Sequence, residues 1–403
     1  MRLVSIRWWW PLAVLGLSCR EAPPVLERIS YSAGPNSESG NLTVGADGRL
    51  YLSWIDRNMN AFRFSRWEEK AWAEPRSIFA GENLSGNWTD LPGMTASSDG
   101  TLFAAWQIFG PHAGNMDRIV HGSIIQIATS RDAGRTWSAA VAPHAWGRSS
   151  QHAFASWAPV SDNEAALIWL DGDEGPGEQG MTLRFARVRS DGTFTPETVI
   201  DERVCDCCPT DLRDMDDGSL LALYRDRSEG EIRDIALAQY DGTRWEAGRV
   251  IHADGWKIAG CPVNGPRLDV QGERVALAWF TTDARDSAHV RVAFSDDAGE
   301  TIGEPIEIAG AQPLGRVDVA LLPNGDAWVS WMEGFSTLAK LHLRCVKPSG
   351  EMEPVIVAAQ VAASRTLPRM ARWKDDLFLV WTETVAAHGR VAESSRVLTA
   401  RFH

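Results

Sequence analysis

Charged side chains gather in two short segments that could bind an anion or carry out acid–base chemistry. The dipeptides Arg225-Asp226 and Arg233-Asp234 lie eight residues apart. Arginine binds carboxylates and other anions through paired hydrogen bonds, and aspartate can act as a general acid or base. We therefore predict that the two arginines bind a ligand and that Asp226 and Asp234 are catalytic. The alternative is an internal network of arginine and aspartate that only stabilises the fold.

Cysteines form a second cluster. Residues 205–208 read Cys-Asp-Cys-Cys, and Cys261 follows at the equivalent place of the next repeat. Neighbouring residues of an extended chain point to opposite sides, so only one of Cys207 and Cys208 should face Cys261. We predict a Cys208–Cys261 disulfide, because Cys208 precedes a proline that fixes the start of the strand. The alternatives are a Cys207–Cys261 disulfide and a zinc or copper site of thiolates helped by His152.

An internal repeat supplies the elements that must position these residues. An apolar stretch, a turn, an alternating apolar stretch and an aromatic residue recur at intervals of 50 to 63 residues. Apolar runs on both sides of Asp-Gly, as at residues 47–48 and 99–100, predict a β-hairpin. The seven copies end at Trp54, Trp106, Trp169, Tyr224, Trp279, Trp331 and Trp381.

Two further short strands follow most copies, and four strands per repeat are typical of a β-propeller blade. We predict an all-β fold with a single propeller of four-stranded blades, seven in number, with six as the alternative. After Trp381 the last copy has one clear strand, residues 396–402. Residues 27–31 are expected to provide its missing outer strand, so that the N-terminal strand closes the ring and no sheet edge stays open. Cys345, in a third strand, is expected to be a buried thiol.

A second motif occupies the turn after the third strand. Residues 130–137 read Ser-x-Asp-x-Gly-x-Thr-Trp, residues 295–302 match all but the last position, and shortened versions occur at 190–194 and 240–245. In such a turn, aspartate accepts backbone N–H groups and glycine supplies a positive φ. Through these motifs the chain from residue 27 to 403 resembles the sialidase-like Asp-box (BNR-repeat) propeller superfamily.

The resemblance implies a sialidase-like propeller and, for an enzyme, a glycosidase related to exo-α-sialidases. Sialidases of this superfamily use an arginine triad, a tyrosine nucleophile and an aspartate acid/base, and they carry an early Arg-Ile-Pro. This chain has no Arg-Ile-Pro, and its tyrosines Tyr31, Tyr51, Tyr224 and Tyr240 fall in predicted strands or turns. The resemblance therefore supports the fold more strongly than sialidase activity.

Propeller sites usually form at the mouth of the axial channel where the innermost strands start and the second strands end. The segments at this mouth are rich in polar residues, as at residues 87–90, which read Asn-Trp-Thr-Asp. Side chains from consecutive copies should converge there on one pocket beside the cysteines. The ligand-binding candidates are Arg225, Arg233, Asn264, Arg316, Arg365 and Trp256, the last of which could stack on a sugar ring.

The first residues predict export. Arg2 and Arg7 give a positive region before an apolar stretch over residues 8–17, which is too short to span a bilayer. It ends Leu-Gly-Leu-Ser-Cys19, which is similar to the bacterial lipobox, where the cysteine is lipidated. We divide the chain into a signal peptide (1–18), a lipid-anchored tether (19–26) and the propeller (27–403). We expect a periplasmic or outer-membrane-attached bacterial lipoprotein, with plain secretion as the alternative.

Composition limits the partners. The formal net charge of −13 argues against nucleic-acid binding, and 44% hydrophobic with 23% charged residues fits a globular chain. We expect a monomer that needs no cofactor or metal and meets a membrane only through its lipid anchor. The predicted function is binding of an acidic glycan or other anionic small ligand at one channel mouth, with glycoside hydrolysis as a further activity. The alternatives are a non-catalytic binding propeller and a cysteine-based metal-binding propeller.

Overall fold

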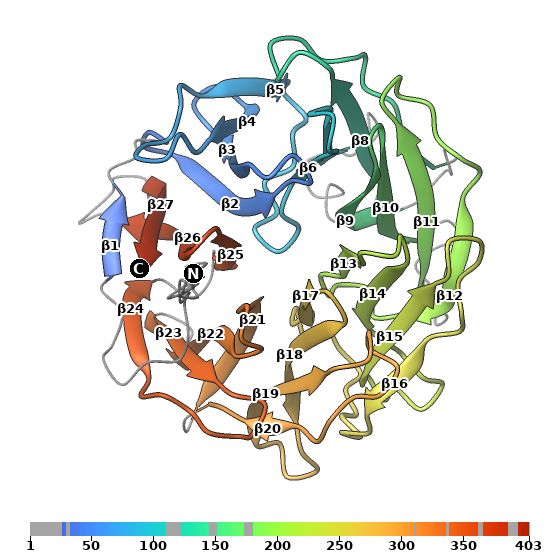
Figure 1. The fold of residues 1–403 in the computed structure, drawn as a ribbon, viewed down its shortest axis with the longest axis vertical. Coiled ribbons are helices and arrows are strands. Elements are labelled where there is room, and N and C mark those ends of the chain that lie inside the picture. The colour runs from blue at the N-terminus through green and yellow to red at the C-terminus, as the bar shows by residue number, and fades with distance from the viewer. Residues whose placement is uncertain are drawn as a thin grey trace, which may run out of the picture.

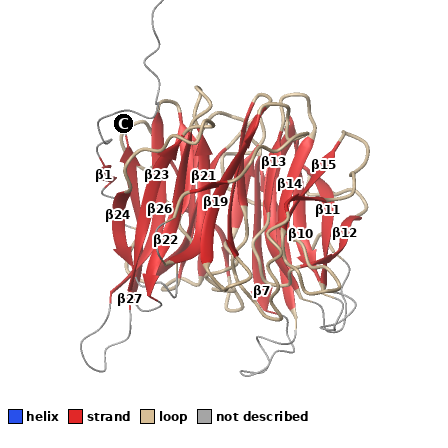
Figure 2. Ribbon diagram, turned by 90° about the horizontal axis from the view of Figure 1, so that it is seen from below, coloured by secondary structure: helices blue, strands red, loops and turns tan. Residues whose placement is uncertain are grey.

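The strands form a ring of seven sheets around one axis (Figures 1 and 2). This computed structural model describes residues 26–29, 33–109, 122–144, 151–172, 180–309, 312–335, 338–361, 366–385 and 394–402. The predicted all-β propeller with seven blades is therefore confirmed, and the alternative of six blades is wrong. Within these ranges, no helix has the length and apolar character needed to cross a bilayer. The predicted signal peptide and most of the tether lie outside the described residues.

The first three blades run from residue 37 to residue 204. Blade 1 consists of β2 (Ser37–Val44), β3 (Leu50–Asp56), β4 (Ala61–Arg66) and β5 (Arg76–Ala80). Blade 2 consists of β6 (Gly93–Ala96), β7 (Leu102–Phe109) and β8 (Ser123–Ser130), and an isolated bridge from Ile127 to Val141 stands in for its fourth strand. Blade 3 consists of β9 (His152–Ser161), β10 (Glu164–Asp171), β11 (Met181–Arg189) and β12 (Thr198–Val204).

The remaining blades have four strands each. Blade 4 consists of β13 (Asp211–Asp214), β14 (Leu220–Arg225), β15 (Ile235–Tyr240) and β16 (Arg249–His252). Blade 5 consists of β17 (Arg267–Gln271), β18 (Arg274–Thr282), β19 (Ala288–Ser295) and β20 (Ile306–Glu307). Blade 6 consists of β21 (Pro313–Leu321), β22 (Ala327–Phe335), β23 (Leu338–Val346) and β24 (Ile356–Val361). Blade 7 consists of β25 (Arg369–Trp373), β26 (Asp376–Val385), β27 (Ser394–Phe402) and β1 (Leu26–Ile29).

The core lies between the blades. Each pair of adjacent blades shares one cluster of buried apolar side chains, from the pair of blades 1 and 2 to the pair of blades 7 and 1. The second strand of each blade carries the repeat's aromatic residue, which is buried in all seven copies. Burying a large aromatic removes more than a hundred square ångströms of surface from water, which explains why the repeat keeps this position aromatic.

The N-terminal strand closes the ring as predicted. Strand β1 pairs antiparallel with β27, and Leu26 lies opposite Phe402. The ion pair between Arg401 Nη2 and Glu27 Oε2, at 2.6 Å, joins the same two strands. The two ends of the chain therefore share one blade, and the sheet edge of blade 7 is covered.

The Asp-box motif forms the turn that its composition predicts. Asp132 Oδ1 accepts the backbone N–H of Thr136 at 2.9 Å, and Gly134 has a φ of 78°. These hydrogen bonds, together with that from the Thr136 hydroxyl, lower the pKa of Asp132 to about 2. Trp137 packs edge-on against Phe64 with ring centroids 6.0 Å apart. The motif therefore holds a turn and joins neighbouring blades.

Candidate functional site

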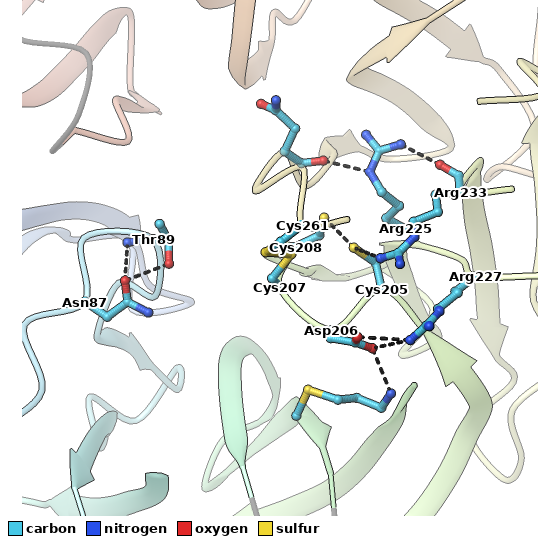
Figure 3. Close-up of a disulfide and its surroundings, with 12 residues drawn as sticks. Asn87, Thr89, Cys205, Asp206, Cys207, Cys208, Arg225, Arg227, Arg233 and Cys261 are labelled. Atoms are coloured by element: carbon cyan, nitrogen blue, oxygen red, sulfur yellow. Dashed lines mark hydrogen bonds and ion pairs between the residues drawn. A yellow bond between two sulfur atoms is a disulfide. The ribbon is translucent and has the colours of Figure 1, made fainter. Parts of the chain in front are cut away.

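A disulfide joins the segments that lead into blades 4 and 5 (Figure 3). The bond links Cys207 to Cys261, with Cα atoms 5.9 Å apart. The predicted inter-blade disulfide is therefore confirmed, but the choice of Cys208 as its partner is wrong. Cys208 is buried and its Sγ lies 2.7 Å from Cys205 Sγ. The side chains alternate as expected, and in this register Cys207 is the residue that faces blade 5.

The other residues of the predicted metal site are otherwise engaged. His152 is fully buried within blade 3, with Nδ1 3.2 Å from Asp171 Oδ2 and its ring stacked on His144. The disulfide removes Cys207 as a thiolate. Cys345 is fully buried in β23 but is disulfide-bonded, so the expectation of a thiol there is wrong.

Arg225 ties blade 4 to blade 5. Its guanidinium donates to three backbone carbonyl oxygens, those of Asn264 at 2.9 Å, Arg233 at 2.6 Å and Phe280 at 2.7 Å. The side chain is 1% exposed, and its Cζ atom lies 4.7 Å from the centroid of the Trp256 ring. The alternative of a stabilising internal residue therefore describes Arg225 better than ligand binding does.

Trp256 and Asp234 belong to the same packed region. Trp256 is buried and meets Phe280 edge-on, with ring centroids 5.5 Å apart, so its face is not open to a sugar. Asp234 accepts the backbone N–H groups of Gly255 at 3.1 Å and Trp256 at 3.2 Å, and its carboxylate holds this loop. Burial raises the pKa of Asp234, and that of Asp226 to about 6. Asp226 is partly exposed, and of the two predicted catalytic acids it is the more accessible.

Beside the disulfide lies a polar cavity of about 390 Å³. Its wall contains Cys207 and Cys261 and a set of paired charges. Arg227 pairs with Asp206 at 3.0 Å and with Glu231 at 2.9 Å, and Arg233 pairs with the other oxygen of Glu231 at 2.9 Å. Of the predicted ligand-binding residues, Arg233 contributes to the wall of this cavity.

The predicted residues Asn264 and Arg316 meet at the start of β21. Asn264 Oδ1 accepts the backbone N–H of Arg316 at 2.8 Å, which holds Arg316 at a φ of 56°. Positive φ is uncommon for a residue with a side chain, and here a bulge in the β21–β22 pairing accompanies it. Ser39 and Phe154 have the same conformation near the starts of their innermost strands. The bulge thus recurs as a feature of the innermost strands. At Arg316 it directs a guanidinium towards the channel mouth.

The guanidinium of Arg316 contacts a loop from the far side of the ring. Its Cζ atom lies 4.5 Å from the centroid of the Trp88 ring. Trp88 belongs to residues 81–92, here called the Trp88 loop, which connect β5 to β6 and reach towards the centre of the ring (Figure 1). Blades 2 and 6 are not neighbours, so this contact crosses the mouth of the channel. Arg365, the remaining predicted ligand-binding residue, lies outside the described residues.

Arg316 is partly buried and has no carboxylate partner among the described residues. Its side chain donates a hydrogen bond of 3.4 Å to the backbone carbonyl of Thr366. Burial lowers the pKa of Arg316 to about 10, with no opposing effect of an acidic neighbour. A guanidinium that loses water without gaining an anion is costly, so an anionic ligand would stabilise this arrangement.

Asp90, at the end of the Trp88 loop, is a carboxyl group that the sequence analysis did not assign. One oxygen accepts the backbone N–H of Phe154 at 3.0 Å, and Oδ2 is buried without a partner in the part of the chain that is described. Burial raises the pKa of Asp90 to about 7. The polar segment Asn-Trp-Thr-Asp was the available signal, but a single aspartate in it could not be told from a turn residue.

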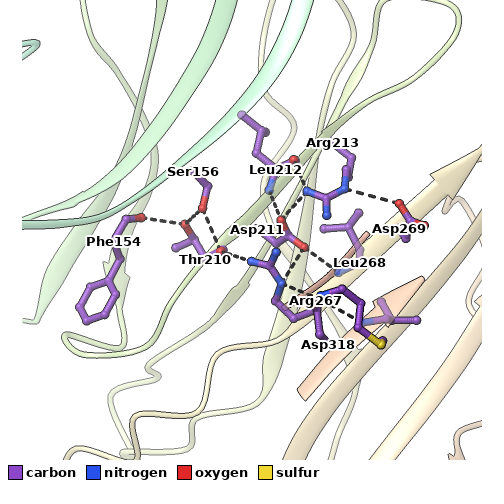
Figure 4. A network of polar contacts seen from close by, with 12 residues as sticks. Phe154, Ser156, Thr210, Asp211, Leu212, Arg213, Arg267, Leu268, Asp269 and Asp318 are labelled. Carbon is purple, nitrogen blue, oxygen red and sulfur yellow. Dashed lines mark hydrogen bonds and ion pairs between the residues drawn. The ribbon is translucent and has the colours of Figure 1, made fainter. Parts of the chain in front are cut away.

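The channel itself has a volume of about 480 Å³ and is lined by charged residues of the innermost strands (Figure 4). Many of them bond from one blade to the next. Asp211 Oδ2 accepts the backbone N–H of Leu268 at 2.9 Å, and Asp318 Oδ2 accepts that of Met370 at 2.7 Å. Arg267 lies between both carboxylates, with Nε 3.4 Å and 3.2 Å away. The charged residues in this part of the channel bond to one another and stabilise the ring. We therefore look for a ligand site at the mouth of the channel.

A reaction of the sialidase type needs a tyrosine that can act as the nucleophile, and each tyrosine in the described ranges is engaged in the fold. Tyr51 donates to Asp47 at 2.6 Å and Tyr224 to Asp201 at 2.7 Å. Tyr240 is buried against Trp245, with ring centroids 5.3 Å apart. Tyr31 lies outside the described residues.

Comparison with known proteins gives a fold and no family. No family model and no curated protein matches this chain. A protein of unknown function from Dyadobacter fermentans DSM 18053 is similar over 94% of this chain and 98% of its own, with a TM-score of 0.53 and 12% identity. The polysaccharide lyase Uly1 is similar over 93% of this chain and 92% of its own, with a TM-score of 0.53 and 10% identity. A Hadza microbial sialidase covers 87% of this chain and 73% of its own at a TM-score of 0.48 and 11% identity. At these identities, the similarity to the first two structures shows a shared fold and nothing about activity.

Proposed function

We propose that this propeller binds an acidic carbohydrate at the channel mouth formed by Arg316 and the Trp88 loop. The observation that carries the proposal is the guanidinium of Arg316, which is partly buried against the ring of Trp88 and has no carboxylate partner in the described part of the chain. A carboxylate or sulfate of a sugar would accept its hydrogen bonds in two-pronged geometry. Neutral sugars would leave the charge unpaired, so acidic ones should bind more tightly.

Glycoside cleavage is the second candidate, and Asp90 favours it. A carboxyl group with a pKa of about 7 is protonated for much of the time at neutral pH and can donate a proton to a leaving oxygen. Oδ2, which has no partner among the described residues, is the oxygen that would carry this proton. Burial also raises the pKa of Asp226 to about 6, and it raises that of Asp234. The proposed activity is thus that of a glycosidase whose acid is Asp90.

The test is a binding measurement with pairs of acidic and neutral oligosaccharides of equal length, made by calorimetry. Arg316→Ala should weaken the acidic ligand by about 10- to 100-fold, which corresponds to loss of a charged hydrogen bond. Arg274→Ala is the matched control, because Arg274 begins the second strand of blade 5 and lies at the hairpin end of the blade. Equal binding of both members of each pair, or no effect of Arg316→Ala, would overturn the proposal. Release of reducing ends from the bound ligand distinguishes cleavage from binding alone.

We also propose that the protein acts outside the cytoplasm, in an oxidising compartment where disulfides such as that of Cys207 and Cys261 persist. Support comes from the N-terminal sequence, whose apolar stretch ends at a cysteine in a lipobox-like setting. A ligand such as an acidic glycan would be met in the periplasm or at the outer membrane.

A further inference from the structure

Four cysteines lie together at the junction of blades 4 and 5 (Figure 3). The disulfide of Cys207 and Cys261 borders the polar cavity, and Cys261 is exposed. Behind it Cys205 and Cys208 are thiols, 1% and 2% exposed. The Sγ atoms of Cys205, Cys207 and Cys208 all lie within 4.8 Å of one another. An accessible disulfide is thus in reach of a buried pair of thiols.

The buried thiols have the spacing and distance of a redox pair. Cys205 and Cys208 form a Cys-x-x-Cys sequence, and their Sγ atoms are 2.7 Å apart. This spacing is typical of dithiols that open and close reversibly, and an S–S bond needs the sulfurs at about 2.05 Å. Closing the pair therefore needs only a small movement of two side chains.

The charges around the pair make its two members unequal. Burial opposes ionisation of Cys205, but the hydrogen bond with Cys208 and the positive charge of Arg225 outweigh it and lower the pKa of Cys205. Arg233 Nη1 adds a hydrogen bond to Cys205 Sγ at 3.3 Å. Burial, followed by the contact with Cys205, raises the pKa of Cys208. Cys205 is therefore the more easily ionised thiol of the pair, and the thiolate is the form that attacks disulfides.

We propose that the four cysteines form a thiol–disulfide relay, in which the buried pair Cys205/Cys208 passes two electrons to the Cys207–Cys261 disulfide and through it to small disulfides in solution. This activity is independent of carbohydrate binding at Arg316. The cavity beside Cys207 and Cys261 has room for a low-molecular-weight thiol or disulfide, and Arg233 forms part of both the cavity and the thiolate site.

The exchange balances within the protein. The Cys205 thiolate attacks Cys207 Sγ, a Cys205–Cys207 bond forms, and Cys261 leaves as a thiolate that takes up a proton. Cys208 then loses its proton and attacks Cys205 Sγ, which forms the Cys205–Cys208 bond and releases Cys207. The buried pair is oxidised by two electrons and the outer pair is reduced. A small disulfide in solution, such as oxidised glutathione, then reoxidises Cys207 and Cys261 and is released as two thiols.

The experiment uses the intact purified protein in glutathione buffers of graded ratio. Samples are quenched with acid, alkylated and mapped as non-reduced peptides. At the stage where two of the four cysteines are alkylated, the relay predicts both isomers, one with the Cys207–Cys261 bond and one with the Cys205–Cys208 bond. A single isomer at every ratio would refute the relay and indicate purely structural cysteines. A stoichiometric metal that protects all four thiols in the reduced protein would also refute it.

A variant distinguishes relay from direct access. Replacing both outer cysteines, Cys207→Ser with Cys261→Ser, should slow oxidation of the buried pair by oxidised glutathione by about tenfold or more, because the exchange step is lost. An unchanged rate would show that the solvent reaches Cys205 directly and would overturn the relay. Should the double variant fail to fold, the peptide map of the unaltered protein still decides the question.

Discussion

The guanidinium of Arg316 lies over the ring of Trp88, with Cζ 4.5 Å from the ring centroid, and this contact joins blade 6 to the loop before blade 2. The Trp88 loop is held at both ends by neighbouring structure. Ser85 donates its backbone N–H to Gln107 at 2.9 Å, and Asn41 donates to the carbonyl of Pro92 at 3.4 Å. The indole is therefore placed by its own loop and in turn positions the charge that we assign to ligand binding.

Loss of the Trp88 ring should weaken binding through Arg316. For Trp88→Ala we expect about 5- to 30-fold weaker binding of an acidic oligosaccharide, because one cation–π contact is lost. Trp88→Phe should have a smaller effect, because an aromatic ring remains. Trp373→Ala is the control, because Lys374 Nζ lies 4.2 Å from its ring in an equivalent contact outside the mouth. Calorimetric titration measures all three. Equal losses for Trp88→Ala and Trp373→Ala would contradict a specific role.

The ionisation of Asp90 should make stability depend on pH. Its pKa is about 7 in the folded chain and about 4 when unfolded, so its neutral form favours folding. This contribution is present below about pH 4 and is lost as the pH rises through 7. Asp90→Asn keeps the acceptor for Phe154 and stays neutral. Its Tm, relative to that of the unaltered protein, should therefore rise between pH 4 and pH 7 and then level off. A constant difference across this range would argue against a raised pKa.

Asp318 should carry much of the contact between blades 6 and 7. It is buried, accepts the backbone N–H of Met370 and lies 3.2 Å from Arg267. Asp318→Ala removes the acceptor of the Met370 N–H and one of the two carboxylates beside Arg267, and it should lower the free energy of unfolding by about 1–3 kcal/mol. Asp318→Asn should cost less, because an acceptor stays. Glu300→Ala, at an exposed position of the second Asp box, should have no effect in the same urea titration.

The number of blades and the closure of the ring could be predicted because both depend on local pattern. In this chain a hairpin forms where two apolar runs surround Asp-Gly. Residues 217 and 218 are an example, since Asp217 Oδ1 accepts the N–H of Ser219 and Gly218 has a φ of 85°. Seven aromatic residues at similar intervals then count the blades. The last copy lacked its outer strand, and the segment before the first copy could provide it.

The role of Arg225 could not be predicted, because arginine at a strand end looks the same whether it meets solvent or three carbonyl groups. Its partners Asn264 and Phe280 lie 39 and 55 residues away and are brought close only by the packing of blade 5 on blade 4. The same holds for the disulfide. Alternation along the chain showed that one of Cys207 and Cys208 must face Cys261, but the register of the whole blade decides which one.

The sequence by itself determined the blades, the turns between their strands and the nearness of the cysteines, since these follow from short-range hydrogen bonding and burial. Asn41, Ser156, Asp211 and Asp318 each stand thirteen residues before the aromatic residue of their blade, and each bonds to the backbone of the next blade. Only the tertiary structure decided what occupies the channel mouth. Arg316 meets Trp88 because a loop from blade 2 crosses the ring, and a contact between non-neighbouring blades leaves no periodic signal in the chain.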